Sequence, residues 1–250
     1  MSVVTRKSEV KEYLHYCISA YQEKGLSACV SELNDQILNR KVKFPLLEYC
    51  AHELSQRIKE SEQILLCDKI EDLKTEGGNV ILGIMLQNRL EHHYQESIDK
   101  ATEYTSKADI WYVCDLIGER LYGFALLHYP DKTIPQIRKL SSHPKIWVVR
   151  SLGAGVHYAV KKGLDRQNVA AAFSILITMA NSKEKEVRQG IGWAAKTTAK
   201  FHPDIIQQYQ SEIHNQEKVA NWFRRKIQIG LAARTYFSNR TLVKCATILG

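Results

Sequence analysis

The 250-residue sequence has few residues that interrupt helices, with only five prolines and thirteen glycines. The strict alternation of apolar and polar residues that predicts half-buried β-strands is nearly absent. No stretch approaches the roughly 20 apolar residues that a membrane span requires. The first residues, MSVVTRKSEVKEYL, also lack the apolar region of a signal peptide. We therefore expect an all-α, cytoplasmic protein with no contact to membranes.

Signatures of several enzyme classes are missing as well. The sequence contains no P-loop, dinucleotide fingerprint, H-E-x-x-H or Ser-His-Asp pattern. Its cysteines form no C-x-x-C pair and have no histidines at zinc-ligand spacing, and the adjacent His92 and His93 have no spaced partners. We predict no metal and no organic cofactor, and we expect reduced, mostly buried thiols at Cys17, Cys29, Cys50, Cys67, Cys114 and Cys245.

Apolar residues recur at helical spacing along most of the sequence. In the segment EVKEYLHYCISAY, for example, Val10, Leu14 and Ile18 share one helical face. The pattern predicts about a dozen helices joined by short turns, which favours antiparallel helix pairs stacked in chain order. Trp111 and Trp147 lie 36 residues apart and Trp193 follows 46 residues later, near the period of two-helix repeats. This spacing favours a helical solenoid over a compact bundle, with residues 1–250 as a single repeat domain.

Local signals predict several helix ends. Ser8 and Ser61 are expected as N-caps, because a serine hydroxyl can accept a bond from the first turn. Pro135 and Pro144 are expected in first turns, where a missing N–H is tolerated. The pair His202-Pro203 should end one helix and begin another.

Charge is unevenly distributed along the chain. The net charge is +8, but residues 1–140 contain 18 Lys and Arg against 21 Asp and Glu, whereas residues 141–250 contain 17 against 6. Segregation of this kind is typical of a face that meets a polyanion such as DNA. The alternative, a basic surface that is merely solvated, remains open.

Three predicted helices each carry a tryptophan close to charged residues. These are Trp111 with Asp115, Trp147 with Arg150, and Trp193 with Lys196 and Lys200. Residues three or four positions apart lie on one helix face. Taken alone, such an aspartate is usually solvated or ion-paired, here with Arg120 or Arg150, and such tryptophans are usually part of the core.

Together these motifs resemble the DNA alkylation repair glycosylases of the AlkD type. The resemblance rests on Trp-x-x-x-Asp at Trp111 and Asp115, Trp-x-x-Arg at Trp147 and Arg150, and GIGWAAKTTAKFHPD around Trp193. It covers roughly residues 105–215 and extends more loosely toward both ends, where FPLL at 44–47 is similar to an early family segment.

The resemblance implies a curved right-handed solenoid of HEAT-like antiparallel helix pairs that acts as a monomer near the bacterial nucleoid. Such a protein would bind double-stranded DNA and excise cationic N3- or N7-alkylated purines by hydrolysing the N-glycosidic bond. By the same resemblance, Asp115 would be the catalytic carboxylate, Trp111 and Trp193 its flanking aromatic rings, and Arg150 a contact to the DNA backbone. Trp147 would support its helix from behind.

Several basic residues are predicted to grip the DNA backbone, because lysine and arginine position a duplex through its phosphates. They are Lys161, Lys162, Lys196, Lys200, Arg224, Arg225, Lys226 and Arg234. Within the same part of the chain, Gly153 and Gly155 indicate tight helix packing or room for a DNA strand. His157 is expected either at a helix interface or against a phosphate.

The sequence also departs from the family pattern. Tyr112 stands where a second acidic residue is common, Glu48 replaces a glycine, and His52 and Leu54 replace an expected proline and arginine. These differences keep open a non-catalytic HEAT-repeat protein that binds damaged or branched DNA. A protein-interaction scaffold of the same fold is a third alternative.

Overall fold

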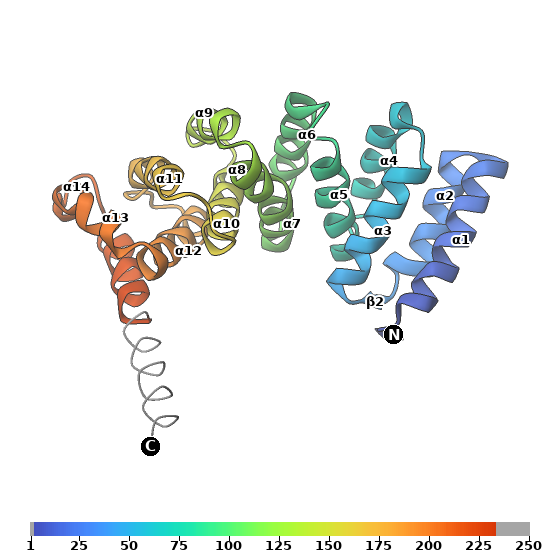
Figure 1. The fold of residues 1–250 in the computed structure, drawn as a ribbon, viewed down its shortest axis with the longest axis horizontal. Coiled ribbons are helices and arrows are strands. Elements are labelled where there is room, and N and C mark those ends of the chain that lie inside the picture. The colour runs from blue at the N-terminus through green and yellow to red at the C-terminus, as the bar shows by residue number, and fades with distance from the viewer. Residues whose placement is uncertain (1–2, 234–250) are drawn as a thin grey trace, which may run out of the picture. The chain divides into compact units, whose positions relative to one another are not determined.

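The computed structural model describes residues 3–233 and is built almost entirely of helices (Figure 1). Its described part contains fourteen labelled α-helices, a further helical segment at 221–233, two π-helical segments and one pair of two-residue strands. The predicted all-α class is confirmed. Arg234 and Cys245 lie outside the described residues.

The helices group into two compact units, residues 1–121 and residues 122–250. In the first unit, a parallel pair of strands joins Val3–Val4 (β1) to Lys41–Val42 (β2). The helical elements of this unit are α1 (Lys7–Lys24), α2 (Leu26–Leu33), η1 (Asn34–Leu38), α3 (Phe44–Arg57), α4 (Glu60–Asp72), α5 (Glu76–Asn88), α6 (Tyr94–Ser106) and α7 (Trp111–Ile117). The π-helical segment η2 (Gly118–Gly123) follows α7.

The helices of the first unit pack in two rows (Figure 1). One row consists of α1, α3, α5 and α7, each in contact with the next, and α2, α4 and α6 pack beside it. Helix α5 lies at the centre, since every residue from Gly78 to Leu86 is buried. A helix that is buried on all sides needs neighbours on all sides, so α5 determines where α3 and α7 lie.

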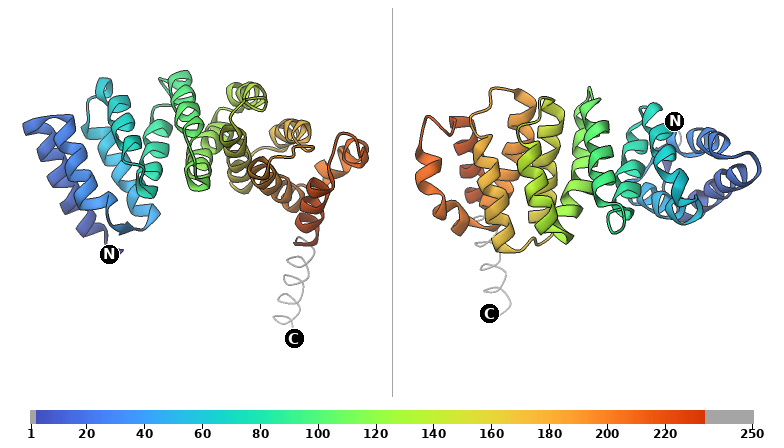
Figure 2. Two further views of the ribbon diagram at one scale, coloured as in Figure 1. Left: turned by 180° about the vertical axis from the view of Figure 1, so that it is seen from behind. Right: turned by 90° about the horizontal axis from the view of Figure 1, so that it is seen from above.

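The second unit repeats this plan. Its helices are α8 (Phe124–His128), α9 (Pro130–Leu140), α10 (Ile146–Lys161), α11 (Arg166–Thr178), α12 (Lys185–Phe201), α13 (Pro203–Gln208), α14 (Gln210–His214) and the helical segment 221–233. Helices α8, α10 and α12 follow one another in one row, while α9 contacts α11 in the other (Figure 2). The prediction of stacked helix pairs therefore holds within each unit, and the curved solenoid and the single domain stay predictions.

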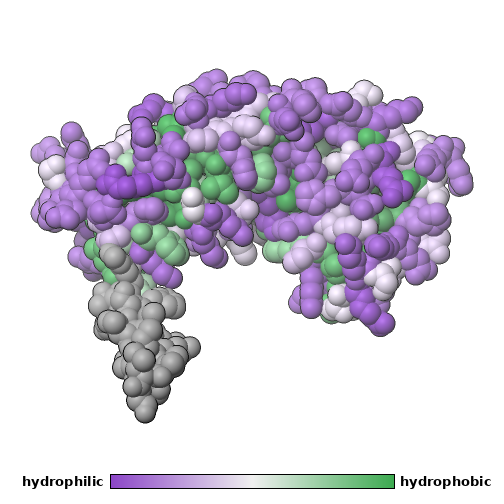
Figure 3. All heavy atoms as spheres, viewed as in Figure 1, coloured by the Kyte–Doolittle hydropathy of each residue, from purple (hydrophilic) through white to green (hydrophobic). Residues whose placement is uncertain are grey.

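The core consists of aliphatic side chains with a few aromatic rings. Leu54 and Ile81 are fully buried in the first unit, as are Phe173 and Phe223 in the second. The expectation for the thiols is confirmed for the five cysteines described, all of which are buried. Burial raises the pKa of Cys50 to about 12, so its thiol stays protonated and unreactive. The surface seen in Figure 3 is mainly hydrophilic, with small hydrophobic areas between the charged side chains.

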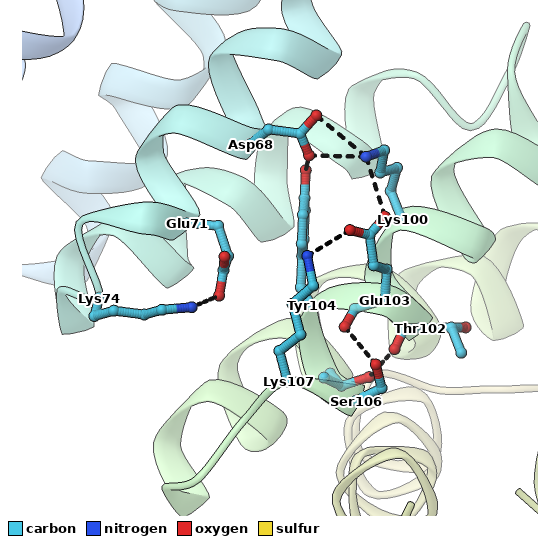
Figure 4. A network of polar contacts seen from close by, with 10 residues as sticks. Asp68, Glu71, Lys74, Lys100, Thr102, Glu103, Tyr104, Ser106 and Lys107 are labelled. Carbon is cyan, nitrogen blue, oxygen red and sulfur yellow. Dashed lines mark hydrogen bonds and ion pairs between the residues drawn. The ribbon is translucent and has the colours of Figure 1, made fainter.

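A polar network ties α4 to α6 in the first unit (Figure 4). Asp68 accepts hydrogen bonds from the buried Tyr104 hydroxyl at 2.7 Å and from Lys100 Nζ at 2.8 Å. Glu103 pairs with Lys100 at 3.1 Å and with Lys107 at 2.5 Å. Burial alone would lower the pKa of Lys100, but its bonds to Asp68 and Glu103 raise it above the ordinary value. Since these charges satisfy one another, the network serves to hold the two helices together.

Several predicted helix ends differ from the structure. Arg6 and Lys59 occupy the N-cap positions of α1 and α4, so Ser8 and Ser61 each lie inside a first turn. Pro135 lies within α9, which begins at Pro130. Pro144 precedes the N-cap residue of α10, so it lies outside that helix. The change of helix at His202-Pro203 is confirmed, with α12 ending at Phe201 and α13 beginning at Pro203.

Within the described part of the chain, no helix is sufficiently long and apolar to cross a lipid bilayer.

Candidate nucleic-acid interface

Helix α7 carries the predicted catalytic carboxylate. The helix begins at Trp111 after the extended residue Ile110, and Asp115 follows one turn later. Cys114, Leu116 and Ile117 form the buried face of α7, so Trp111 is left 54% exposed and Asp115 half-buried. A largely exposed indole is unusual, because tryptophan is highly buried on average. Trp111 and Asp115 are therefore neighbours on one helix, as the sequence predicts.

The residues that follow Asp115 are held firmly to the rest of the first unit. Arg120 in η2 is buried, and its Nη2 donates to Glu48 Oε1 on α3 at 2.9 Å. Its guanidinium lies over the Phe44 ring at 5.4 Å. A Cβ built on Gly83 of α5 would lie 2.9 Å from Arg120 Cβ, so that glycine permits the close approach. Arg120 thus links the end of α7 to both α3 and α5.

Arg150 lies in the second unit and is 6% exposed. Its Nη1 donates to Glu186 Oε2 at 2.5 Å and to Gln189 Oε1 at 2.7 Å, and both partners belong to α12. Sequence reasoning missed these two partners, because only the packing of α10 against α12 brings together residues 36 and 39 positions apart. Trp147, on the same helix as Arg150, is half-buried.

Trp193 is fixed by a histidine from the neighbouring helix. The rings of His157 on α10 and Trp193 on α12 stack with centroids 3.8 Å apart and an interplanar angle of 23°. His157 Nδ1 lies 2.6 Å from Thr197 Oγ1, within hydrogen-bond distance. Burial, followed by the charges of Lys161 and Lys196, lowers the pKa of His157 to about 4. The imidazole is therefore neutral near pH 7, and the interfacial alternative predicted for His157 is confirmed.

Glycines allow α10 and α12 to approach unusually closely. A Cβ built on Gly153 would lie 2.2 Å from the carbonyl carbon of Gly190, and one on Gly190 would lie 2.4 Å from the Arg150 oxygen. Gly230, in the segment 221–233, lies equally close to α12, because a Cβ on it would lie 2.2 Å from the Lys196 oxygen. The tight-packing interpretation of Gly153 is confirmed.

The remaining predicted DNA contacts all lie in the second unit. Lys161, Lys162, Lys196 and Arg225 are exposed. Lys200, half-buried, lies 5.2 Å from the Phe201 ring, and Arg224 Nη1 donates to the Val219 oxygen at 2.6 Å. The side chain of Lys226 packs beside Gly192.

The two units differ sharply in charge. Residues 1–121 contain 15 Lys and Arg against 20 Asp and Glu, whereas residues 122–250 contain 20 against 7. The first unit contributes Trp111 and Asp115, and the second contributes Arg150, Trp193 and the basic residues. That these two sets form one site stays a prediction. Among residues 3–233, no group of His, Cys, Asp and Glu side chains is arranged to hold a metal ion.

Residues 40–226 match a family described as "DNA alkylation repair enzyme". The matched segment covers well over half of the chain and includes Trp111, Asp115, Arg150 and Trp193. No curated protein matches the chain.

Proposed function

Because the chain belongs to the DNA alkylation repair enzyme family, we propose that it is a glycosylase that removes cationic N3- or N7-alkylated purines from duplex DNA. Water adds to the sugar carbon as the base leaves, so the reaction is a hydrolysis. The alkylated purine already carries positive charge and leaves without strong acid catalysis. The transition state instead needs stabilisation of an oxocarbenium-like sugar.

The observation that carries this proposal is the exposed Trp111 one turn before Asp115. In the proposal, the carboxylate stabilises the developing positive charge on the sugar and orients the attacking water. The indole face attracts the cationic base, which contributes about 0.5–2 kcal/mol per ring. Trp193, whose ring is stacked on the neutral His157, provides the second aromatic surface. Asp115 must therefore contribute more than either ring.

Arg150 acts in this proposal from within the α10–α12 pair. Its Nη1 is engaged by Glu186 and Gln189, so in this proposal Arg150 meets a DNA phosphate as part of this fixed group. The exposed basic residues of the second unit carry more of the backbone contact. Lys161, Lys162, Lys196 and Arg225 are the principal members of this group, because all four are exposed.

The experiment that tests this function is direct measurement of base release. The purified protein is incubated with methylated duplex DNA, and free 3-methyladenine and 7-methylguanine are quantified. We expect release to be proportional to enzyme concentration and absent from unmethylated duplex. The absence of both products at an excess of protein over DNA would refute the glycosylase assignment.

A second candidate function is binding of damaged or branched DNA without catalysis. The pairing of Glu48 with Arg120 favours it, because this glutamate neutralises a cation in a unit that already has more acidic than basic residues. On balance such a unit repels DNA phosphates, so the unit that carries Asp115 would be held less firmly on the duplex. Tight binding of a junction together with no base release would establish this second function.

A further inference from the structure

The second unit contains a basic pocket next to the start of α12. It has a volume of about 600 Å³ and lies between the residues that precede α12 and the first turns of the segment 221–233. We call it the Trp222 pocket. Its lining includes four cations and two apolar side chains, namely Lys183, Arg188, Arg225, Lys226, Trp222 and Ile229.

The pocket wall is built from fixed contacts. Trp222 Nε1 donates to the Ser182 oxygen at 3.2 Å, and Ala220 N donates to the Ala180 oxygen at 3.1 Å. The guanidinium of Arg188 lies 5.8 Å from the centre of the Trp222 ring. These contacts join the turn before α12 to the segment 221–233. The wall is therefore in place before any ligand arrives.

The cations of the Trp222 pocket lack the acidic partners that several arginines have elsewhere in the described residues. Arg57, Arg89, Arg120, Arg150 and Arg166 each lie within 4 Å of a carboxylate.

Within residues 3–233, Lys183, Arg188, Arg225 and Lys226 form no such ion pair, and the pocket lining contains no acidic residue. Glu184, the next residue after Lys183 in the chain, is exposed and lies at the N-cap position of α12. Like charges gathered in one concave site repel one another and create a positive potential, which a bound anion would relieve.

We propose that the Trp222 pocket binds phosphate groups of one strand of duplex DNA. This inference rests on the proposed function, and it adds Lys183 and Arg188 to the predicted contacts Arg225 and Lys226. Arginine forks pair well with phosphate oxygens, and lysine adds a compact positive charge. The pocket is much larger than a single phosphate group. Ile229, which is 50% exposed, offers an apolar surface that suits a deoxyribose rather than a free inorganic ion.

The first test compares two charge-matched double variants. Lys183→Gln/Arg188→Gln removes two cations from the pocket, whereas Arg138→Gln/Lys139→Gln removes two exposed cations from α9. If each pocket cation neutralises one phosphate, the salt slope of duplex binding falls by about 2 in the pocket variant. Affinity at 0.1 M salt should fall about tenfold or more. The α9 variant should stay within about twofold of the parent.

A single substitution guards against misfolding of the double variant. Arg225→Gln changes one exposed residue and should lower the salt slope by about 1. Pocket variants that bind duplex with the parent's affinity and slope would overturn the inference while leaving the proposed function standing. The parent could release no base while the pocket variants still bind duplex more weakly than the parent does. That outcome would support the pocket and contradict the glycosylase proposal.

The second test identifies the source of the phosphate. The indole N–H of Trp222 gives an NMR signal that the Trp222→Phe variant assigns. We expect a methylated duplex to shift this signal stoichiometrically, and we expect inorganic phosphate at millimolar concentration to leave it in place. Saturable binding of inorganic phosphate that competes with the duplex would instead show a small-anion site. That result, or a signal unmoved by either ligand, would overturn the inference.

Discussion

Gly153 lies where α10 and α12 pack most closely, so Gly153→Ala is the most demanding test of helix packing in the second unit. The new Cβ would lie 2.2 Å from the carbonyl carbon and 2.3 Å from the oxygen of Gly190, and 2.6 Å from Ile191 N. Carbon atoms are best placed about 3.5–4.0 Å apart, so the helices must separate by about 1 Å or more. The obstacle is backbone rather than a side chain that can rotate, so the overpacking cost should be near the upper end of its range, about 3 kcal/mol.

Alanine also favours the helix over glycine by about 1 kcal/mol. The net loss in the free energy of unfolding should therefore be about 2 kcal/mol, which lowers the Tm by about 4–8 °C in a chain of this size. The same separation should loosen the Arg150–Glu186 pair and the His157–Trp193 stack, because both join α10 to α12.

Urea and thermal unfolding followed by circular dichroism at 222 nm measure this effect. Gly77→Ala is the matched control, because a Cβ there would meet Leu38 and Leu47 at an ordinary 3.4 Å. We expect the control to be as stable as the parent or slightly more stable. A Gly153→Ala protein of parental stability, or an equal loss in both variants, would refute the packing argument.

Three further predictions concern the same unit. The folded-state pKa of His157, about 4, lies below its ordinary value of 6.5. Between these two pH values the unfolded chain therefore binds more protons than the folded chain. The contribution of His157 to the free energy of unfolding is full above pH 6.5 and falls by about 3 kcal/mol toward pH 4. His157→Asn should flatten that part of the pH dependence of the free energy of unfolding, and parallel curves for parent and variant would contradict it. Arg150→Ala leaves Glu186 without a buried partner and should cost about 3 kcal/mol in urea unfolding, and a loss below about 1 kcal/mol would show that the pair is unimportant. Lys161→Gln/Lys196→Gln should weaken duplex binding and lower the salt slope by about 2 relative to the α9 double variant, and an unchanged slope would exclude both lysines as phosphate contacts.

Much of the fold follows from local patterns in the sequence. Helical periodicity suffices to predict the all-α class, and residues four apart share a helix face wherever α7 lies. Trp111 and Asp115 were therefore predictable as neighbours. Pro203 follows the end of α12 because proline cannot donate within a helix but is tolerated at its first position.

Local sequence patterns could not predict the features that depend on how the helices pack. Arg150 was predicted to face DNA, yet its burial depends on Glu186, which a separate helix supplies. The prediction of serine N-caps was wrong for a related reason. Burial of Val10 and Leu66 constrains which faces of α1 and α4 pack inward, but it does not fix the residue at which either helix begins. Thr75 and Asp165 do act as caps, each accepting a backbone hydrogen bond. The division into two units also rests on contacts between distant residues, which a single sequence does not reveal.

The central claim is that Asp115 carries the chemistry, and Asp115→Asn tests it most directly. Asparagine keeps the shape of the side chain, removes its charge and replaces one carboxylate oxygen with an NH2 donor. On methylated duplex with enzyme in excess, we predict that the first-order rate of 3-methyladenine release falls at least about 100-fold, because a preorganised charge is lost. Duplex affinity should change less than twofold in the same variant. Release at the parent's rate would contradict the account.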